Sequence, residues 1–265
     1  SLLRALPTGC RLILVGDPDQ LPPVGPGCPL SDILRSGVVP AVRLTEIFRQ
    51  AQESLIVMNA HRVNSGVMPD LKTVTSDFFF LRRRTEEAVA STIGDLCRTR
   101  LPDRMGIPPE EIQVLSPTRK GPTGTASLNL LLQAQLNPPA PDKKEKKWGD
   151  FSFREGDRVM QIRNNYDILW KKTDGTQVGT GIFNGDIGVI TEIDLNAELL
   201  TVVFDDRQAE YDFDMLRELE LAYAMTVHKS QGSEYQAVVL AAWSCAPNLR
   251  TRRVLYTAIT RARKL

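Results

Sequence analysis

The amino-acid sequence predicts an α/β fold with a parallel β-sheet and a small inserted β-barrel. Up to about residue 136, short apolar runs alternate with segments of helical periodicity, which is the order of a parallel α/β domain. From residue 150 to about residue 214 the pattern changes to short strands separated by turn signals, as in small barrels. The alternation of strand and helix resumes at residue 219, so the barrel is predicted to be an insertion.

The N-terminal part is expected to alternate strands and helices. The predicted strands are apolar runs at residues 11–15, 78–81 and 112–116. The predicted helices lie at residues 2–6, 30–36, 51–64, 85–100 and 124–136. The helix at 85–100 has the clearest start, because Thr85 can cap it and Glu86 and Glu87 place negative charge in its first turn.

The rest of the chain divides into a linker, the barrel and a second α/β segment. Residues 137–147 are rich in proline and charge, which predicts a linker or mobile loop. The expected barrel strands are 158–162, 188–193 and 199–204, with turns at 184–186 and 205–206. Strands at 219–225 and 237–242 and a helix at 252–263 are expected to follow.

Composition excludes several classes of protein. Of the 265 residues, 42% are apolar and 25% charged, as in globular proteins, and the net charge of +1 limits any nucleic-acid contact to a local patch. No apolar run is long enough to span a bilayer, so we expect neither a membrane span nor a signal peptide. The four cysteines form no CxxC pair and only two histidines occur, so we predict free thiols, no metal site and a cytoplasmic location.

The stretch VGDPDQLPPVG, residues 15–25, places polar groups directly after the predicted strand at 11–15. Ligands of open α/β sheets bind beyond the carboxyl ends of the strands, where Asp17 and Gln20 are expected. Pro22 and Pro23 stiffen the loop because each fixes φ and lacks a backbone donor. Taken alone, the stretch is equally compatible with an ordinary polar turn.

Similar polar groups occur near other predicted strand ends. In AMTVHKSQGSEY, Thr226, His228 and Ser230 alternate, and hydroxyl and imidazole groups suit phosphate oxygens. Arg49, in LTEIFRQ, and Arg261, in LYTAITRARK, could each present a guanidinium fork to the charge that develops in phosphoryl transfer. A surface ion pair is the simpler interpretation of either arginine alone.

Together these motifs resemble those of superfamily-1 DNA helicases. VGDPDQLPPVG, LTEIFRQ, VLSPTRKGPTGTASLN, AYAMTVHKSQGSEY and LYTAITRARK follow the family's order over nearly the whole chain and are most similar to the RecD-like group. The resemblance implies ATP-driven translocation on single-stranded DNA with 5′-to-3′ polarity, by two RecA-like motor domains, in DNA repair and recombination. It also implies a motor that acts as a monomer without a membrane partner.

The resemblance also implies roles for individual residues. Gln20 would sense the γ-phosphate in a loop shaped by Asp17, and Arg49 and Arg261 would reach the same phosphate from the second motor domain. Gly232 and Glu234 would approach the nucleotide, with Glu234 at the ribose. The residues expected to face the DNA backbone are Thr118, Arg119, Lys120, Thr226, His228 and Ser230.

By the same resemblance the chain divides into four segments. Residues 1–45 would end a first RecA-like domain, residues 46–149 and 216–265 would form the second, and residues 150–215 would be an SH3-like β-barrel. The chain contains no GxxxxGK[ST] phosphate loop and no Asp-Glu strand end before Gly16, which would hold ATP and Mg²⁺. We therefore expect a piece of a longer polypeptide that has no ATPase activity alone.

A second interpretation is a non-catalytic module that binds single-stranded DNA on the barrel. Its stacking faces would come from five aromatic residues, Phe151, Phe153, Tyr166, Trp170 and Phe183, although small barrels also fill their core with aromatic side chains. SH3-like peptide recognition is a third possibility, which leaves the strand-end motifs unexplained. A nuclease has little support because no carboxylates cluster with metal-ligand spacing.

Overall fold

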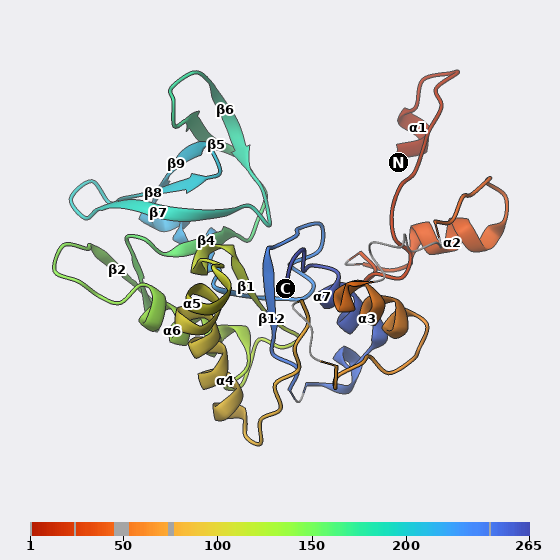
Figure 1. The fold of residues 1–265 in the computed structure, drawn as a ribbon. Coiled ribbons are helices and arrows are strands. Elements are labelled where there is room, and N and C mark those ends of the chain that lie inside the picture. Colours follow the sequence, from red (N-terminus) through yellow and green to blue (C-terminus); the bar gives the residue numbers. More distant parts are fainter. Residues whose placement is uncertain (1, 24, 45–52, 74–76, 244) are drawn as a thin grey trace.

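A computed structural model describes residues 2–23, 25–44, 53–73, 77–243 and 245–265. These residues form a three-stranded parallel sheet with the order β11-β1-β12 and a seven-stranded antiparallel sheet with the order β10-β4-β7-β8-β9-β5-β6. A separate hairpin pairs β2 (Glu145–Trp148) with β3 (Phe151–Arg154). Figure 1 shows the antiparallel sheet beside one end of the parallel sheet.

The parallel sheet is built around β1 (Ile112–Ser116), all of whose residues are buried. On one side β1 pairs with β11 (Ala224–Thr226), which aligns Ser116 with Thr226. On the other side it pairs with β12 (Ala237–Leu240). A strand that is buried on both faces reads as a continuous apolar run, which is why β1 was predictable from the sequence.

Helices cover both faces of this sheet, because alternate side chains of β1 point to opposite faces. Val114 packs with buried residues of α4 (Glu86–Asp95) and α6 (Thr125–Leu136). Leu115 packs with α7 (Arg252–Ile259), which in turn packs against α3 (Leu55–Asn64). Figure 1 shows the two pairs of helices on opposite sides of β1.

The antiparallel sheet has a core of large side chains, including Tyr211, Phe204 and Ile190. Its strands are β4 (Arg158–Gln161), β5 (Asn165–Lys172), β6 (Val178–Ile182), β7 (Ile187–Asp194), β8 (Leu199–Phe204), β9 (Arg207–Asp212) and β10 (Leu219–Leu221). Strand pairing over the described residues runs from β10 to β6 without closing. The expected barrel is therefore an open sheet.

The predicted strand at 219–225 is two strands in different sheets. β10 pairs with β4 in the antiparallel sheet, and β11 pairs with β1 in the parallel sheet. Only Ala222 and Tyr223 separate them, and both are buried. The sequence reads as one apolar run because each half is buried in its own sheet.

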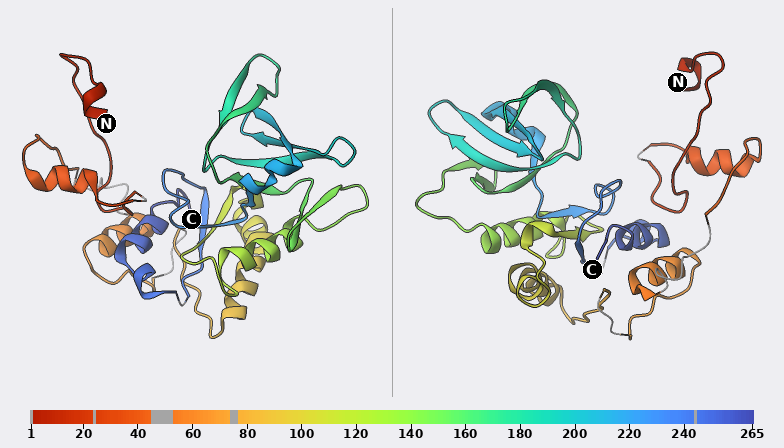
Figure 2. Two further views of the ribbon diagram at one scale, coloured as in Figure 1. Left: turned by 180° about the vertical axis from the view of Figure 1, so that it is seen from behind. Right: turned by 45° about the horizontal axis from the view of Figure 1, so that its top comes forward.

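Two predicted strands are wrong. Residues 11–15 form no strand, and Ile13 and Val15 are 75% and 94% exposed. Residues 78–81 are also irregular, and Phe79 and Phe80 are exposed. Neither segment pairs with a strand among the described residues, and an apolar run becomes a strand only where a neighbour accepts its backbone hydrogen bonds. Figure 2 shows the chain up to α2 (Pro29–Ser36) extending away from both sheets.

The predicted loop at 137–147 is also wrong at both of its ends. Residues Glu145–Trp148 form β2, and Lys146 lies over the ring of Phe213 at 3.9 Å from its centroid. Asn137 is buried and donates to the carboxylate of Asp157 at 2.8 Å. Charge and proline content alone could not show these long-range contacts.

The predicted helices are present with shifted ends. The helix predicted at 85–100 begins as α4, continues as a π-helical turn (Leu96–Arg100) and ends as α5 (Leu101–Met105). The helix predicted at 51–64 is described from Leu55 on, and residues 51–52 lie outside the described residues. The first predicted helix is α1 (Leu2–Ala5). In the described part of the chain, no helix is long and apolar enough to cross a membrane.

Candidate functional site

The loop at residues 16–21 lies against α7 and the turn that follows β11. The Leu21 amide donates to Thr257 Oγ1 at 3.0 Å, and Gln231 Nε2 donates to the Leu21 carbonyl at 2.7 Å. These partners are 236 and 210 residues away in the sequence. The GDPDQLPP motif is thus attached to two other predicted motifs.

Asp17 organises this loop. Its carboxylate accepts from the Asp19 amide at 2.9 Å, from Gln20 Nε2 at 3.2 Å and from the Tyr256 hydroxyl at 2.8 Å. Burial raises the pKa of Tyr256, and Asp17 raises it further, so the phenol remains a donor. Because Gln20 donates its amide nitrogen to Asp17, its Oε1 atom faces away from Asp17.

Arg261 lies on the other side of that oxygen. Arg261 is 5% exposed, and its Nη2 atom donates to Gln20 Oε1 at 3.2 Å. Its other acceptors are the carbonyls of Ser233 and Thr257, at 2.9 and 3.2 Å, and Thr260 Oγ1, at 3.3 Å.

All of these acceptors are uncharged. In the described part of the chain, no carboxylate lies within ion-pair distance of Arg261. A buried cation without a charged partner is costly, so this guanidinium favours the approach of an anion.

The predicted nucleotide contacts beside Arg261 are exposed. Gly232 has φ of +83°, a conformation that L side chains rarely adopt, and it lies next to Ser233, whose carbonyl holds Arg261. The Glu234 side chain is 62% exposed and is 3.7 Å from Arg263 Nε. Arg49 lies outside the described residues.

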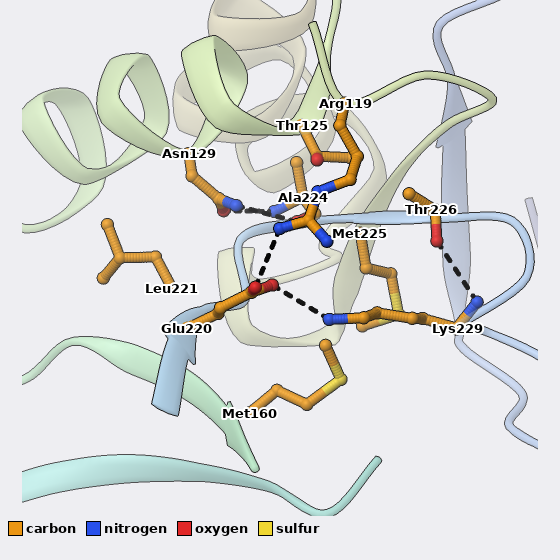
Figure 3. A pocket seen from close by; sticks show the side chains of 10 residues that line it. All are labelled: Arg119, Thr125, Asn129, Met160, Glu220, Leu221, Ala224, Met225, Thr226 and Lys229. Carbon is orange, nitrogen blue, oxygen red and sulfur yellow. Dashed lines mark hydrogen bonds and ion pairs between the residues drawn. The ribbon is translucent and has the colours of Figure 1, made fainter. Parts of the chain in front are cut away.

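A second group of predicted residues meets where β1 and β11 end. Because Ser116 aligns with Thr226, the segment Thr118–Lys120 comes close to the turn after β11. Arg119 Nη2 and Lys229 Nζ both bond the carboxylate of Glu220, at 2.8 and 2.9 Å (Figure 3). Burial alone raises the pKa of Glu220, but its bonds and charge interactions with Lys229 and Arg119 outweigh that effect and hold the pKa below its usual value.

The predicted DNA-facing residues differ in their exposure. Arg119 and Lys120 are exposed, and Thr118, Thr226 and His228 are half-buried. Ser230 is fully buried, and its hydroxyl donates to the Val227 carbonyl at 2.8 Å. The prediction that Ser230 faces DNA is therefore wrong for this conformation, because its hydroxyl bonds the local backbone.

Sequence reasoning did not single out Lys229, Glu220 or Tyr256. Lys229 could have been found, since it is the cation within TVHKSQG. Glu220 gave no signal because it lies inside a predicted apolar strand. No group of three or more His, Cys, Asp or Glu residues that could hold a metal ion occurs among the described positions.

Models of three known families match this chain in order. An AAA domain matches residues 1–77, the SH3 domain of ATP-dependent RecD-like DNA helicases matches residues 128–204, and the C-terminal domain of UvrD-like helicases matches residues 221–265. The ATP-dependent RecD2 DNA helicase of Deinococcus radiodurans is 35% identical over 263 residues, which is 99% of this chain and 33% of that protein. The chain is thus similar to RecD-like helicases along nearly its whole length.

A second curated protein and a solved structure are also similar to this chain. The RecBCD enzyme subunit RecD of Mycolicibacterium smegmatis is 28% identical over 99% of this RecD-like chain and 45% of its own length. The chain thus spans between a third and a half of these relatives. A Pif1 helicase from Bacteroides, solved with single-stranded DNA, has 16% identity and a TM-score of 0.49 over 97% of this chain and 61% of its own.

These findings confirm the resemblance inferred from the motifs and the predicted combination of a parallel α/β domain with an SH3-like module. The domain boundaries predicted at residues 45, 149 and 215 stay predictions.

Proposed function

We propose that this chain is part of an ATP-dependent DNA helicase in which Gln20 and Arg261 contact the γ-phosphate of ATP. The contact between Gln20 Oε1 and Arg261 Nη2 supports the proposal most directly. It joins an uncharged amide to a buried cation whose acceptors in the described part of the chain are all neutral. Phosphoryl transfer spreads negative charge over the γ-phosphate oxygens, and a guanidinium fork stabilises that charge.

The neighbouring residues would serve the same nucleotide. Asp17 orients Gln20, Gly232 lets the chain turn beside the nucleotide, and Glu234 would reach the ribose. Arg49 would act as a second arginine on the phosphate. The phosphate loop and the ligands of Mg²⁺ would come from outside these residues, since the sequence contains no GxxxxGK[ST] motif.

Single-stranded DNA is the proposed polynucleotide, with 5′-to-3′ movement by a monomeric cytoplasmic motor. The residues proposed to contact its phosphates lie at or just after the ends of two adjacent strands; they are Thr118, Arg119, Lys120, Thr226 and His228. Residues 1–45 and the segments 46–149 and 216–265 would belong to the two motor domains.

An unwinding assay on the complete protein tests this proposal. Duplexes with a single-stranded tail on the 5′ side should be unwound when ATP and Mg²⁺ are present, and duplexes with a 3′ tail should not. Equal unwinding of both substrates would contradict the polarity, and no nucleotide-dependent unwinding of either would contradict the proposed function.

One observation favours the second candidate function, a non-catalytic module that binds single-stranded DNA. Tyr166 and Phe183 are 66% and 39% exposed, and their rings pack edge-to-face with centroids 5.5 Å apart. Exposed aromatic rings on a sheet suit base stacking. Phe153 is fully buried and cannot contribute. Loss of binding on Tyr166→Ala, in a protein that hydrolyses no ATP, would favour this module over a motor.

The chain of 265 residues alone should hydrolyse no ATP above background. It contains Gln20 and Arg261, which would contact the γ-phosphate, but it contains neither the phosphate loop nor the ligands of Mg²⁺. Phosphate release from ATP is the measurement, with the complete protein as the positive control. Hydrolysis by the isolated chain at the rate of the complete protein would disprove the expectation.

Replacing Tyr256 with phenylalanine in the complete protein should lower kcat for ATP hydrolysis about tenfold with little change in KM. The variant loses only the hydroxyl that donates to Asp17, so Gln20 is held less firmly while the nucleotide keeps its direct contacts. Tyr211→Phe is the matched control, because it removes another buried phenol hydroxyl, which donates to Gln161 Oε1 at 2.9 Å within the antiparallel sheet. Steady-state ATPase rates distinguish the two variants, and equal rates would rule out a positioning role for Tyr256.

A further inference from the structure

Glu220 is placed between two cations that come from different segments. Arg119 follows β1 and Lys229 follows β11, whereas Glu220 lies on β10, in the antiparallel sheet. Both cations contact the one carboxylate, through different oxygens, at 2.8 and 2.9 Å. Figure 3 shows their charged ends converging on Glu220 in a pocket that Thr226 also lines.

The arrangement resembles an anion-binding site in which the Glu220 carboxylate occupies the position of the anion. Two cations and one carboxylate leave one positive charge in excess. The distances match those of charge-assisted bonds, which Arg and Lys also form with phosphate oxygens. Among the described residues, Thr226 Oγ1 accepts a bond from the Lys229 amide, at 3.3 Å, and donates none, so its hydroxyl hydrogen can donate to an anion in the same pocket.

The exposure of these side chains permits exchange. The side chains of Arg119, Glu220 and Lys229 are 63%, 33% and 27% exposed. Water can therefore solvate the carboxylate when it separates from either cation, and ion pairs of this kind are weak. The backbone of Glu220 is held between Leu219 and Leu221, whose side chains are buried, so separation requires only a rotation of its side chain.

We propose that Glu220 is an internal counter-anion that occupies a phosphodiester site formed by Arg119, Lys229 and Thr226, and that a phosphate of single-stranded DNA exchanges with it. The inference rests on the proposed function and adds Lys229 to the DNA contacts. Glu220 lies on β10, which pairs with β4 in the SH3-like antiparallel sheet. A residue of that sheet therefore decides whether the site is open to a DNA phosphate. Glu220 therefore weakens DNA binding and moderates its dependence on salt.

The test measures binding of the complete protein to fluorescent oligothymidylate by anisotropy at several salt concentrations. Glu220→Gln should bind about fivefold more tightly than the parent protein, since neither cation has to give up a carboxylate. Its salt dependence should also be steeper, because both cations are free to replace the counterions of DNA. Glu220→Asp, which keeps the charge on a shorter side chain, should lie between them.

Glu210→Gln is the matched control for net charge, because Glu210 is exposed on β9 in the same sheet and forms no ion pair with the described residues. Equal affinities of Glu220→Gln and Glu210→Gln would overturn the inference, and so would weaker binding by Glu220→Gln and Glu220→Asp alike. If the parent protein binds no single-stranded DNA, the proposed function fails as well.

Discussion

Replacing Arg261 with alanine in the complete protein should lower kcat for DNA-stimulated ATP hydrolysis by about 10³-fold. Arg261 is 5% exposed and its guanidinium has only uncharged acceptors among the described residues, so its charge is available to the γ-phosphate as negative charge develops there. Arg261→Lys should restore little of this loss, because an ammonium group cannot form the bidentate fork.

The matched control is Arg263→Ala. Arg263 lies two residues further along, is exposed and is 3.7 Å from the carboxylate of Glu234. We expect its loss to change kcat by less than about threefold, since exposed ion pairs contribute little. Steady-state ATPase assays with saturating DNA compare the variants.

Gln20→Glu separates a catalytic role of Arg261 from a structural one. The variant places a carboxylate within about 3 Å of the buried guanidinium, to judge from the 3.2 Å between Gln20 Oε1 and Arg261 Nη2. An internal anion would compensate the cation and compete with the phosphate. The variant also loses the bond from Gln20 Nε2 to Asp17 and places a carboxylate beside that one, which offsets the gain from the new ion pair. We therefore expect little change in thermal stability while ATPase activity falls. Unchanged activity in this variant and in Arg261→Ala would refute a contact with the phosphate.

Replacing Asp157 with asparagine should destabilise the fold by about 3–5 kcal/mol. Asp157 is fully buried and accepts four hydrogen bonds, from the Arg154 amide, Gln133 Nε2, Asn137 Nδ2 and the Tyr223 hydroxyl, at 2.6 to 3.0 Å. All four partners donate, so the amide group of asparagine would oppose at least one of them with its own N–H.

Burial raises the pKa of Asp157, and the hydrogen bonds from Asn137, the Arg154 amide, Gln133 and Tyr223 oppose that rise. The network joins α6, the buried Asn137, the turn after β3 and the segment between β10 and β11. Its loss should therefore loosen the antiparallel sheet from the parallel domain.

Urea unfolding of the chain, followed by the fluorescence of Trp148 and Trp170, measures the effect on stability. Asp167→Asn on β5 is the control, because Asp167 is exposed and its carboxylate forms no hydrogen bond with described residues. A midpoint for Asp157→Asn equal to that of Asp167→Asn would show that the network contributes nothing to stability.

A structural element was predicted correctly from the sequence where the interactions that form it lie within a few residues of the chain. Thr85 caps α4 through a bond to the Ala88 amide, which is a contact within one turn, and that helix was predictable. Residues 11–15 and 112–116 have similar apolar patterns, yet only the second run is a strand. The difference lies in β11 and β12, whose residues come more than 100 positions later in the chain.

The residues of the candidate site also fall into those that a local motif predicted and those that only distant contacts define. Gln20, Arg261 and Arg119 were predicted from their own motifs, and the structure places Gln20 against Arg261 across 241 residues. Glu220 lies in a run that reads as one apolar strand, and its role depends on cations 101 and 9 residues away. Nothing in the local sequence marks a carboxylate whose partners come from other segments.

The sequence by itself determined the resemblance to RecD-like helicases, the order of helices and strands around β1, and the residue types that can bind phosphate. These follow from periodicity, capping and short motifs, which act over a few residues. Only the tertiary structure decided that residues 219–225 form two strands in different sheets and that Glu220 lies between Arg119 and Lys229. It also decided that Arg261 is buried with no charged partner among the residues that the structure describes. The reason is that pairing, burial and charge compensation depend on which distant segments become neighbours when the chain folds.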